Sequence, residues 1–205
     1  MEGDDSHHRA DGDDEVLAHT RRWLEEGVIG LHLCPFASSV YEREQVRCVV
    51  ERHAAFEGVV ERTLDEAARL LETPDDEVAT TLVICPDAME SFEVFLDGAA
   101  TIRYALEASG TDAYLQIATF HPDYRFQGTE PNELGNYTNR APYPVYHVLR
   151  ESHVTEAVES HPNPDAIPED NIERLESMGR EAVERMWRQW QPGGEGMPDN
   201  LSSTE

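Results

Sequence analysis

Apolar side chains recur along the chain with two spacings, that of a helix and that of a strand. Three short apolar runs have the length and the β-branched content of buried strands. Two longer segments between them place apolar side chains three and four positions apart, as an amphipathic helix does. The predicted strands are residues 45–50, 80–85 and 114–120, and the predicted helices between them are residues 60–71 and 92–106.

Helical spacing also marks the ends of the apolar region. A helix is expected to begin after Asp14 and to stop before Pro35. Because proline suits the first turn of a helix, a short helix is expected to begin near residues 142–144. A second short helix is expected over residues 154–160, and a long one from Pro168 to Trp190.

Strands that alternate with helices predict an α/β fold. We expect a single domain over residues 15–190, with a small, mainly parallel sheet of three or four strands. Right-handed βαβ crossovers would join the strands, with flanking helices and a helical C-terminal part. Residues 1–14 are acidic and residues 191–205 are polar, so both ends are expected to be disordered.

The net charge of the chain excludes some classes of binding partner. The 205 residues include 42 Asp and Glu against 16 basic residues, all of them Arg, for a formal net charge of -26. Nucleic-acid binding and adhesion to an anionic membrane are excluded as main activities, because both need a surplus of cations. We suspect a salt-rich cytoplasm as the setting, with an acidic mesophile protein as the alternative.

Three cysteines, an odd number at wide spacing, argue against a disulfide framework and for a reducing compartment. The first fifteen residues hold no secretory apolar stretch, and no apolar run approaches membrane-spanning length. The expected location is therefore cytoplasmic.

The predicted strands end in polar residues and cysteine. Residues 51–53 follow the first strand, Cys85 ends the second and His121 follows the third. In a parallel sheet these groups would share one edge, where Cys34 could join them. Cys34, Cys85 and His121 could then bind a metal with one position open, or Cys34 could be a reactive thiolate beside a positive group. The alternative is that both cysteines are small buried apolar side chains.

The segment from His121 to Ala141 shows neither helical nor strand spacing, and a connection of this length in a domain more often carries function than acts as a spacer. Residues 120–147 hold six of the sixteen aromatic side chains. His121 could exchange a proton near neutral pH, Asp123 could orient its ring, and Tyr124 could form a pocket wall.

Further polar residues surround the expected helix start after this loop. Asn139 and Arg140 precede it, and exposed N–H groups with a guanidinium suit an anion. Tyr143, His147 and Arg150 would share one helical face. Alternatively, both arginines pair with neighbouring glutamates and His147 is a satisfied interface histidine.

Four segments together resemble the bacterial family named domain of unknown function 1415, and the resemblance covers essentially all of residues 15–190. It implies no reaction, cofactor or partner. His32 stands where the family pattern has Asn, and Ala141 stands where it has Ser, which disfavours acyl-enzyme chemistry at that position. The segments are residues 30–37 (GLHLCPFA), 120–129 (FHPDYRFQGT), 136–151 (NYTNRAPYPVYHVLRE) and 167–179 (IPEDNIERLESMG).

The first hypothesis is an enzyme that acts on a small anionic metabolite, with His121 and Asp123 in acid/base chemistry and Arg140 and Arg150 as the anion clamp. A second is a non-catalytic binding or assembly module that uses the aromatic loop 120–147. A third is a metal or thiol redox site at the Cys/His group. The cofactor and the oligomeric state stay unassigned.

Overall fold

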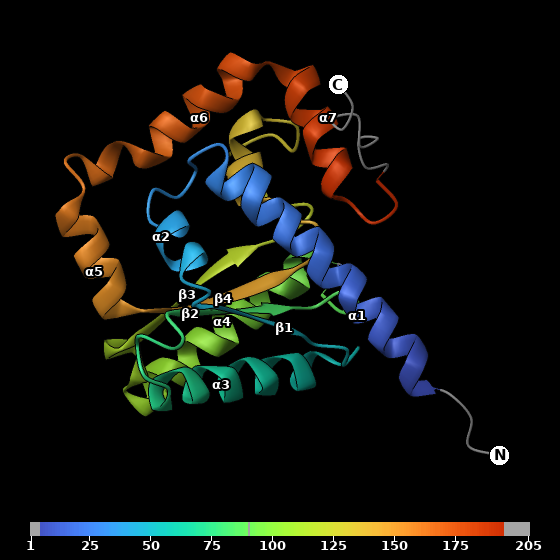
Figure 1. Cartoon of the computed structure of the whole chain (residues 1–205), viewed down its shortest axis with the longest axis vertical. Coiled ribbons are helices and arrows are strands. Elements are labelled where there is room, and N and C mark those ends of the chain that lie inside the picture. Colours follow the sequence, from blue (N-terminus) through green and yellow to red (C-terminus); the bar gives the residue numbers. More distant parts are fainter. Residues whose placement is uncertain (1–4, 90, 195–205) are drawn as a thin grey trace, which may run out of the picture.

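A computed structural model describes residues 5–89 and 91–194 of the chain. Its centre is a single four-stranded sheet with the spatial order β1-β2-β4-β3 (Figure 1). β1 and β2 are parallel, whereas β4 is antiparallel to both of its neighbours, β2 and β3. The strands are β1 (Val46–Val50), β2 (Thr80–Ile84), β3 (Leu115–Phe120) and β4 (Val145–Arg150).

The α/β class and the first three strands are confirmed, but the expectation of a mainly parallel sheet is wrong. β4 enters between β2 and β3 and runs against both, so only the β1–β2 pair is parallel. Residues 145–150, which were expected to be helical, form this strand. Pro142 and Pro144 therefore precede a strand rather than open a helix.

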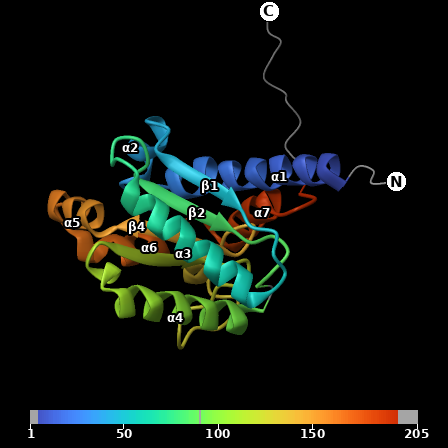
Figure 2. The ribbon, with the colours of Figure 1, turned by 90° about the horizontal axis from the view of Figure 1, so that it is seen from below.

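α3 (Phe56–Glu72) and α4 (Phe92–Ser109) cover one face of the sheet (Figure 2). Ser91 caps α4, since its side chain accepts a hydrogen bond from the N–H of Val94. Gly110 ends the same helix at φ 72°, a conformation that glycine adopts without steric cost. Val59, Phe95 and Ile102 lie fully buried between these helices and the sheet.

The opposite face lies under the remaining helices (Figure 1). A buried cluster that includes Trp23, Leu82, Val145 and Trp190 joins the N-terminal and C-terminal helices of this group to the sheet. The elements on this side are α1 (Asp5–Arg22), the π-helix η1 (Trp23–Ile29), α2 (Ala37–Glu42), α5 (Glu151–Ser160), α6 (Ile167–Met178) and α7 (Arg180–Trp190). Short 3-10 helices η2 (Thr111–Ala113), η3 (Leu134–Asn139) and η4 (Pro164–Ala166) complete the described chain.

Two helices differ from the sequence prediction. α1 begins at Asp5, within the segment 1–14 that was expected to be disordered. Residues 1–4 and 195–205, which belong to the ends that were expected to be disordered, lie outside the described residues. The long C-terminal helix is two helices, because Gly179 adopts φ 78° and ψ 151° between α6 and α7.

Among the described residues, none of the helices combines the length and the apolar character needed to cross a membrane.

Candidate functional site

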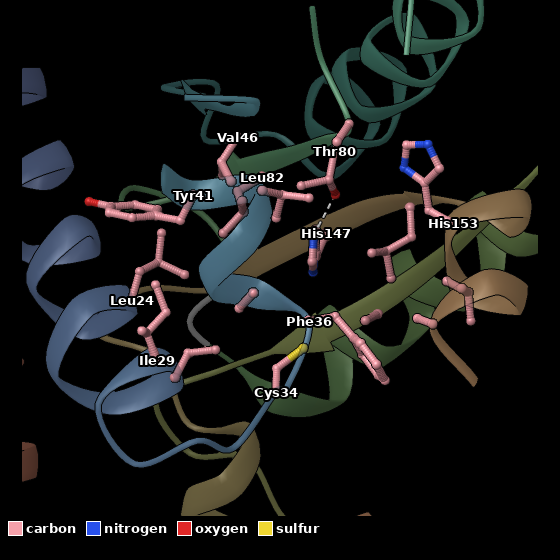
Figure 3. Close-up of a pocket in the computed structure, with 18 of the residues that line it drawn as sticks. Leu24, Ile29, Cys34, Phe36, Tyr41, Val46, Thr80, Leu82, His147 and His153 are labelled. Carbon is pink, nitrogen blue, oxygen red and sulfur yellow. Dashed lines mark hydrogen bonds between the residues drawn. The ribbon is translucent and has the colours of Figure 1, made fainter. Parts of the chain in front are cut away.

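A cavity of about 340 Å³ lies between the sheet and the helices on the α1 side (Figure 3). An engineered cavity of about 150 Å³ is large enough to bind benzene, so this one has room for a larger apolar molecule. Its volume also falls within the range usual for small-molecule sites. The lining residues are almost all apolar and include Leu24, Val28, Phe36, Val40, Val46, Leu82, Ala118, Phe120, Leu149 and Val154.

The pleat of β4 decides which of its side chains reach the cavity. His147 and Leu149 line it, whereas Tyr146 and Val148 belong to the core under α3 and α4. His147 stands opposite Leu82 of β2 and Ala118 of β3 in the register. Because Ala118 is small, the floor of the cavity beside the imidazole stays open.

The π-helix η1 supplies another wall. The N–H of Gly30 donates to the carbonyl of Glu25, five residues earlier, at 2.9 Å. Gly27 lies against the Trp190 ring, and a Cβ at this position would come within 2.6 Å of it. The missing side chain lets α7 dock on η1, while Val28 and Ile29 face the cavity. Single π-helical turns are frequent at functional sites.

His147 is the polar group on the cavity floor. Its Nε2 lies 2.6 Å from Thr80 Oγ1, and this hydroxyl donates to the carbonyl of Val148 at 2.7 Å. Since the hydroxyl has one proton and gives it to the carbonyl, Nε2 must carry the proton of the imidazole. Nδ1 is then the acceptor, and Figure 3 shows it on the side of the ring away from Thr80.

Burial lowers the pKa of His147 to about 4, because the charged imidazolium is poorly solvated here. The ring is therefore neutral at pH 7. It offers the cavity a hydrogen-bond acceptor and no positive charge.

Cys34 approaches the cavity from the turn between η1 and α2. Burial raises the pKa of its thiol, and the N–H groups of Phe36 and Ala37 oppose this only in part. The sulfur is thus a protonated thiol at neutral pH, not the reactive thiolate of the sequence hypothesis. In Figure 3 Cys34 and Phe36 lie across the imidazole from Thr80.

Two polar side chains at the margin of the cavity already contact carboxylates of the chain. Tyr41 donates to Glu25 at 2.6 Å, and burial together with this carboxylate raises the pKa of Tyr41 to about 12. His153 of α5 lies 3.5 Å from an oxygen of Asp75. Both side chains therefore already contact a carboxylate of the chain itself.

His121 lies elsewhere, on the α4 side of the sheet. Its exposed fraction is 1%, and its ring packs 5.0 Å from that of Phe95, measured between centroids. Nε2 is 2.8 Å from the carbonyl of Met89, and Nδ1 accepts the backbone N–H of Asp123 at 3.0 Å. Asp123 thus orients the ring through its backbone, and both ring nitrogens bond to the chain itself.

The loop residues grouped with His121 stabilise the loop. Arg140 donates to the carbonyl of Pro131 at 2.7 Å and lies 4.1 Å over the Tyr137 ring. Asn139 donates to the carbonyl of Thr119 at 3.3 Å. The Tyr124 ring packs 5.3 Å from that of Phe92, measured between centroids. These rings therefore pack against other side chains of the same chain.

The remaining predicted site residues separate. Tyr143 lies under α1, where its hydroxyl is 2.8 Å from His19 Nδ1, and burial raises its pKa to about 12. Arg150 ends β4, at the opposite end of the strand from Arg140. Its guanidinium donates to the carbonyls of Leu70 and Thr73, each at 2.7 Å, at the C-terminus of α3.

The proposed metal or thiol group is also divided. Cys85 is fully buried in the core under α3 and α4, and burial raises the pKa of its thiol. Cys34 lines the cavity on the other face. Across the part of the chain that the structure describes, no group of three or more His, Cys, Asp or Glu is placed to hold a metal ion.

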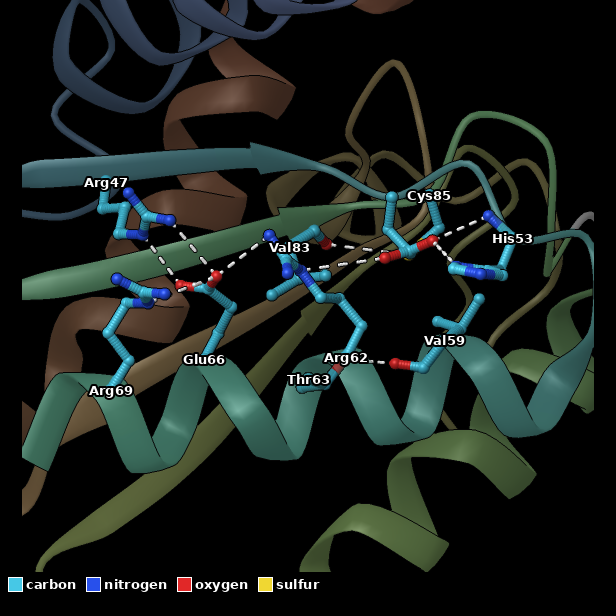
Figure 4. Close-up of polar contacts among 10 residues, drawn as sticks. Arg47, His53, Val59, Arg62, Thr63, Glu66, Arg69, Val83 and Cys85 are labelled. Atoms are coloured by element: carbon cyan, nitrogen blue, oxygen red, sulfur yellow. Dashed lines mark hydrogen bonds and ion pairs between the residues drawn. The ribbon is translucent and has the colours of Figure 1, made fainter.

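A polar network on the α3 side has a structural role (Figure 4). Arg47 of β1 makes two hydrogen bonds to Glu66, at 2.8 and 3.2 Å, and Arg62 and Arg69 also pair with this carboxylate. Burial alone would raise the pKa of Glu66, but the hydrogen bond and charge of Arg47 outweigh it, so the pKa is lowered. These ion pairs connect the edge strand β1 to α3.

The sequence named His147 and Cys34 but assigned them to different groups. It did not identify Thr80, whose hydroxyl fixes the imidazole tautomer, or the apolar walls of the cavity. The available signal was a single histidine inside the apolar run Val145–Leu149. Ala141, where the resembled pattern has Ser, is fully buried in the core on the α1 side.

Comparison with curated proteins and with solved structures gives no match. A family model described as protein of unknown function (DUF1415) matches residues 15–185, which is most of the chain. The match spans the whole sheet, the cavity and the first half of α7. The chain therefore belongs to the DUF1415 family.

Proposed function

We propose that this protein binds a small, uncharged and predominantly apolar molecule in the cavity between η1, α2, α5 and the sheet. The observation that carries the proposal is an apolar cavity of about 340 Å³ with one neutral imidazole on its floor. Concave apolar sites with a few placed polar groups are the usual form of small-molecule sites.

The polar groups of the cavity favour a neutral ligand over the anionic metabolite of the first hypothesis. His147 and Cys34 are uncharged at neutral pH. Arg150 contributes to the lining, but its two terminal nitrogens bond to backbone carbonyls and to Asp75, and only Nε has no partner among the described residues. A carboxylate would lose its hydration without gaining a cation.

A cavity-filling substitution tests the proposal. Naphthalene serves as the neutral probe and 2-naphthoate as the anionic one. At ten times its dissociation constant, naphthalene should stabilise the parent by about 1.4 kcal/mol, which raises Tm by roughly 3–6 °C. Ala118→Phe should remove this stabilisation, because the new ring occupies the space beside His147.

Ala100→Phe is the matched control, since Ala100 is exposed on α4 and should leave binding unchanged. 2-Naphthoate should not stabilise any of the three proteins. The proposal fails if naphthalene has no effect on the parent, or if Ala118→Phe binds it as well as the parent does.

A further inference from the structure

We infer that the molecule held in this cavity carries a hydroxyl group on an apolar body, and that the hydroxyl donates a hydrogen bond to Nδ1 of His147. The inference rests on the proposed binding function and specifies the chemistry of its ligand. An apolar alcohol or phenol has this combination of groups.

The direction of the hydrogen bond is fixed by the sheet. The register pairs Thr80 with Leu149, which brings the Thr80 hydroxyl within 2.7 Å of the Val148 carbonyl. If the imidazole proton moved to Nδ1, the Thr80 hydroxyl would have to donate to Nε2. The Thr80 oxygen would then lie against the Val148 carbonyl oxygen with no proton between them, and the two oxygens would repel each other. The backbone pairing therefore keeps Nδ1 an acceptor.

An acceptor inside an apolar cavity discriminates between ligands. A hydroxyl satisfies Nδ1, whereas an ether or ketone oxygen brings only further lone pairs and a hydrocarbon brings nothing. Figure 3 shows apolar residues such as Leu24, Ile29 and Val46 on the surrounding walls, suited to the body of the ligand. Leaving one buried polar group unpaired should lower the affinity about tenfold or more.

The Cys34 thiol gives an independent measure of occupancy, because it lines the same cavity. A bound ligand should slow alkylation of Cys34 by N-ethylmaleimide. Cys48, on β1, is not among the residues that line the cavity and serves as the internal reference. Peptide mass spectrometry separates the two sites.

Three probes with one ring system test the inference: 2-naphthol, 2-methoxynaphthalene and naphthalene. Calorimetry on the full chain should give 2-naphthol an affinity about tenfold or more above those of the other two. Protection of Cys34 should follow the same order. His147→Phe should bind naphthalene and lose the preference for the hydroxyl.

Thr80→Val tests the fixed tautomer without removing the imidazole. With the Thr80 hydroxyl gone, either ring nitrogen can carry the proton, so the preference for 2-naphthol over 2-methoxynaphthalene should shrink severalfold. Thr81→Val is the matched control. Its hydroxyl has no hydrogen-bond partner among the described residues, and its side chain is not part of the cavity lining.

The outcomes separate the two proposals. If naphthalene and 2-naphthol bind the parent equally, or if Thr80→Val keeps the full preference, the inference about the hydroxyl is overturned while the binding function stands. If none of the three probes binds or protects Cys34, the binding function itself fails.

Discussion

Two histidines that pack on the sheet, His121 and His147, satisfy their ring nitrogens in different ways. His121 bonds through both ring nitrogens to its own backbone, at Met89 and Asp123. His147 bonds to Thr80 through Nε2 and presents its other nitrogen to a cavity. A buried imidazole fully engaged by its own chain favours a structural role, whereas one with a nitrogen facing a cavity suits ligand binding.

The lowered pKa of His147 links its burial to stability. An unfolded histidine titrates near 6.5, whereas His147 titrates at about 4 in the fold. Between these values the unfolded chain binds the extra proton, so stability is complete above about pH 6.5 and falls as the pH drops towards 4. The loss should reach roughly 3 kcal/mol.

Urea unfolding of the parent and of His147→Phe at pH 7.0, 5.5 and 4.5 measures this effect. The parent should lose more stability than the variant between the first and last values. Cys34 and Tyr41, with raised pKa values, stay protonated throughout and add nothing to the difference. Parallel pH profiles of the two proteins would contradict the assignment.

His32 is one of three non-glycine residues with a positive φ among the described residues. It adopts φ 52°, in the left-handed region, and its side chain is exposed in the turn after η1. Asn tolerates this conformation better than most side chains, and Asn is the residue that the family resemblance expects here. His32→Asn should therefore raise the free energy of unfolding, by about 0.5 kcal/mol.

Arg43→Asn is the comparison for that substitution, because Arg43 is exposed at the end of α2 with φ -86°. It should show no gain in chemical denaturation. Equal or greater stabilisation at Arg43 would mean that the left-handed backbone is not the cause.

At the scale of elements, Arg150 connects the end of β4 to the end of α3. Its guanidinium donates to three carbonyls, those of Leu70, Thr73 and Val78, and pairs with Asp75 at 2.9 Å. The last carbonyls of a helix have no partner within the helix, so this side chain completes the C-terminus of α3. Its contacts are those of a structural anchor.

Replacing this guanidinium should be costly. Arg150→Met leaves buried carbonyls without donors and should destabilise the fold by about 3 kcal/mol, lowering Tm by roughly 6–12 °C. Arg150→Lys should recover only part of the loss, because an ammonium lacks the planar fork.

Arg103→Met, on the exposed side of α4, provides the comparison in the same thermal melts and should stay within about 0.5 kcal/mol of the parent. An Arg150→Met protein as stable as this control would exclude the anchoring role.

The elements also show which parts of the fold the sequence could predict. The first three strands and the α3 and α4 helices were found, because their apolar runs are bounded by clear helix and strand signals. β4 was missed because it is central and largely buried on both faces, so its polar and apolar residues do not alternate as they do in a half-exposed strand. The two prolines before it then favoured a helix start.

Predicting β4 as a helix determined which residues were grouped in the predicted site. A helix over residues 143–150 would bring Tyr143, His147 and Arg150 to one face. In the strand, Arg150 still borders the cavity that His147 lines, but its guanidinium reaches the C-terminus of α3 instead of joining the imidazole. The strand also separates Arg140 from Arg150 by the length of β4. No local pattern reveals where a strand inserts in a sheet. The cavity depends on contacts between segments that are far apart in the sequence, so it could not be predicted from the spacing of residues.

At the scale of the whole molecule, the large negative net charge affects the stability of the fold. The chain has 42 acidic residues against 16 arginines, so pairs of like charge outnumber pairs of opposite charge. The exposed ion pairs, such as Arg22–Glu26 and Arg180–Glu184, are each worth little. Net repulsion should therefore destabilise the compact state at low ionic strength.

Stability should consequently rise with salt. Between 0.1 M and 1 M NaCl the screening length falls from about 10 Å to about 3 Å, which removes most of the repulsion between surface carboxylates. Tm should increase steeply at low salt and then level off, because screening saturates once this length is shorter than the spacing of the charges. Stabilisation by solute exclusion, as with sulfate, would instead keep rising with concentration.

A charge-reduced variant separates screening from other effects of salt. Glu61, Glu72, Glu107 and Glu173 are exposed on helices and take part in none of the ion pairs found among the described residues, so replacing all four by Gln removes repulsion and little else. The variant should melt higher than the parent at 0.1 M NaCl and gain less from added salt. If parent and variant respond to salt alike, or if Tm falls as NaCl rises, repulsion is not what limits the stability of this acidic fold, and the expectation of a salt-rich setting loses its physical basis.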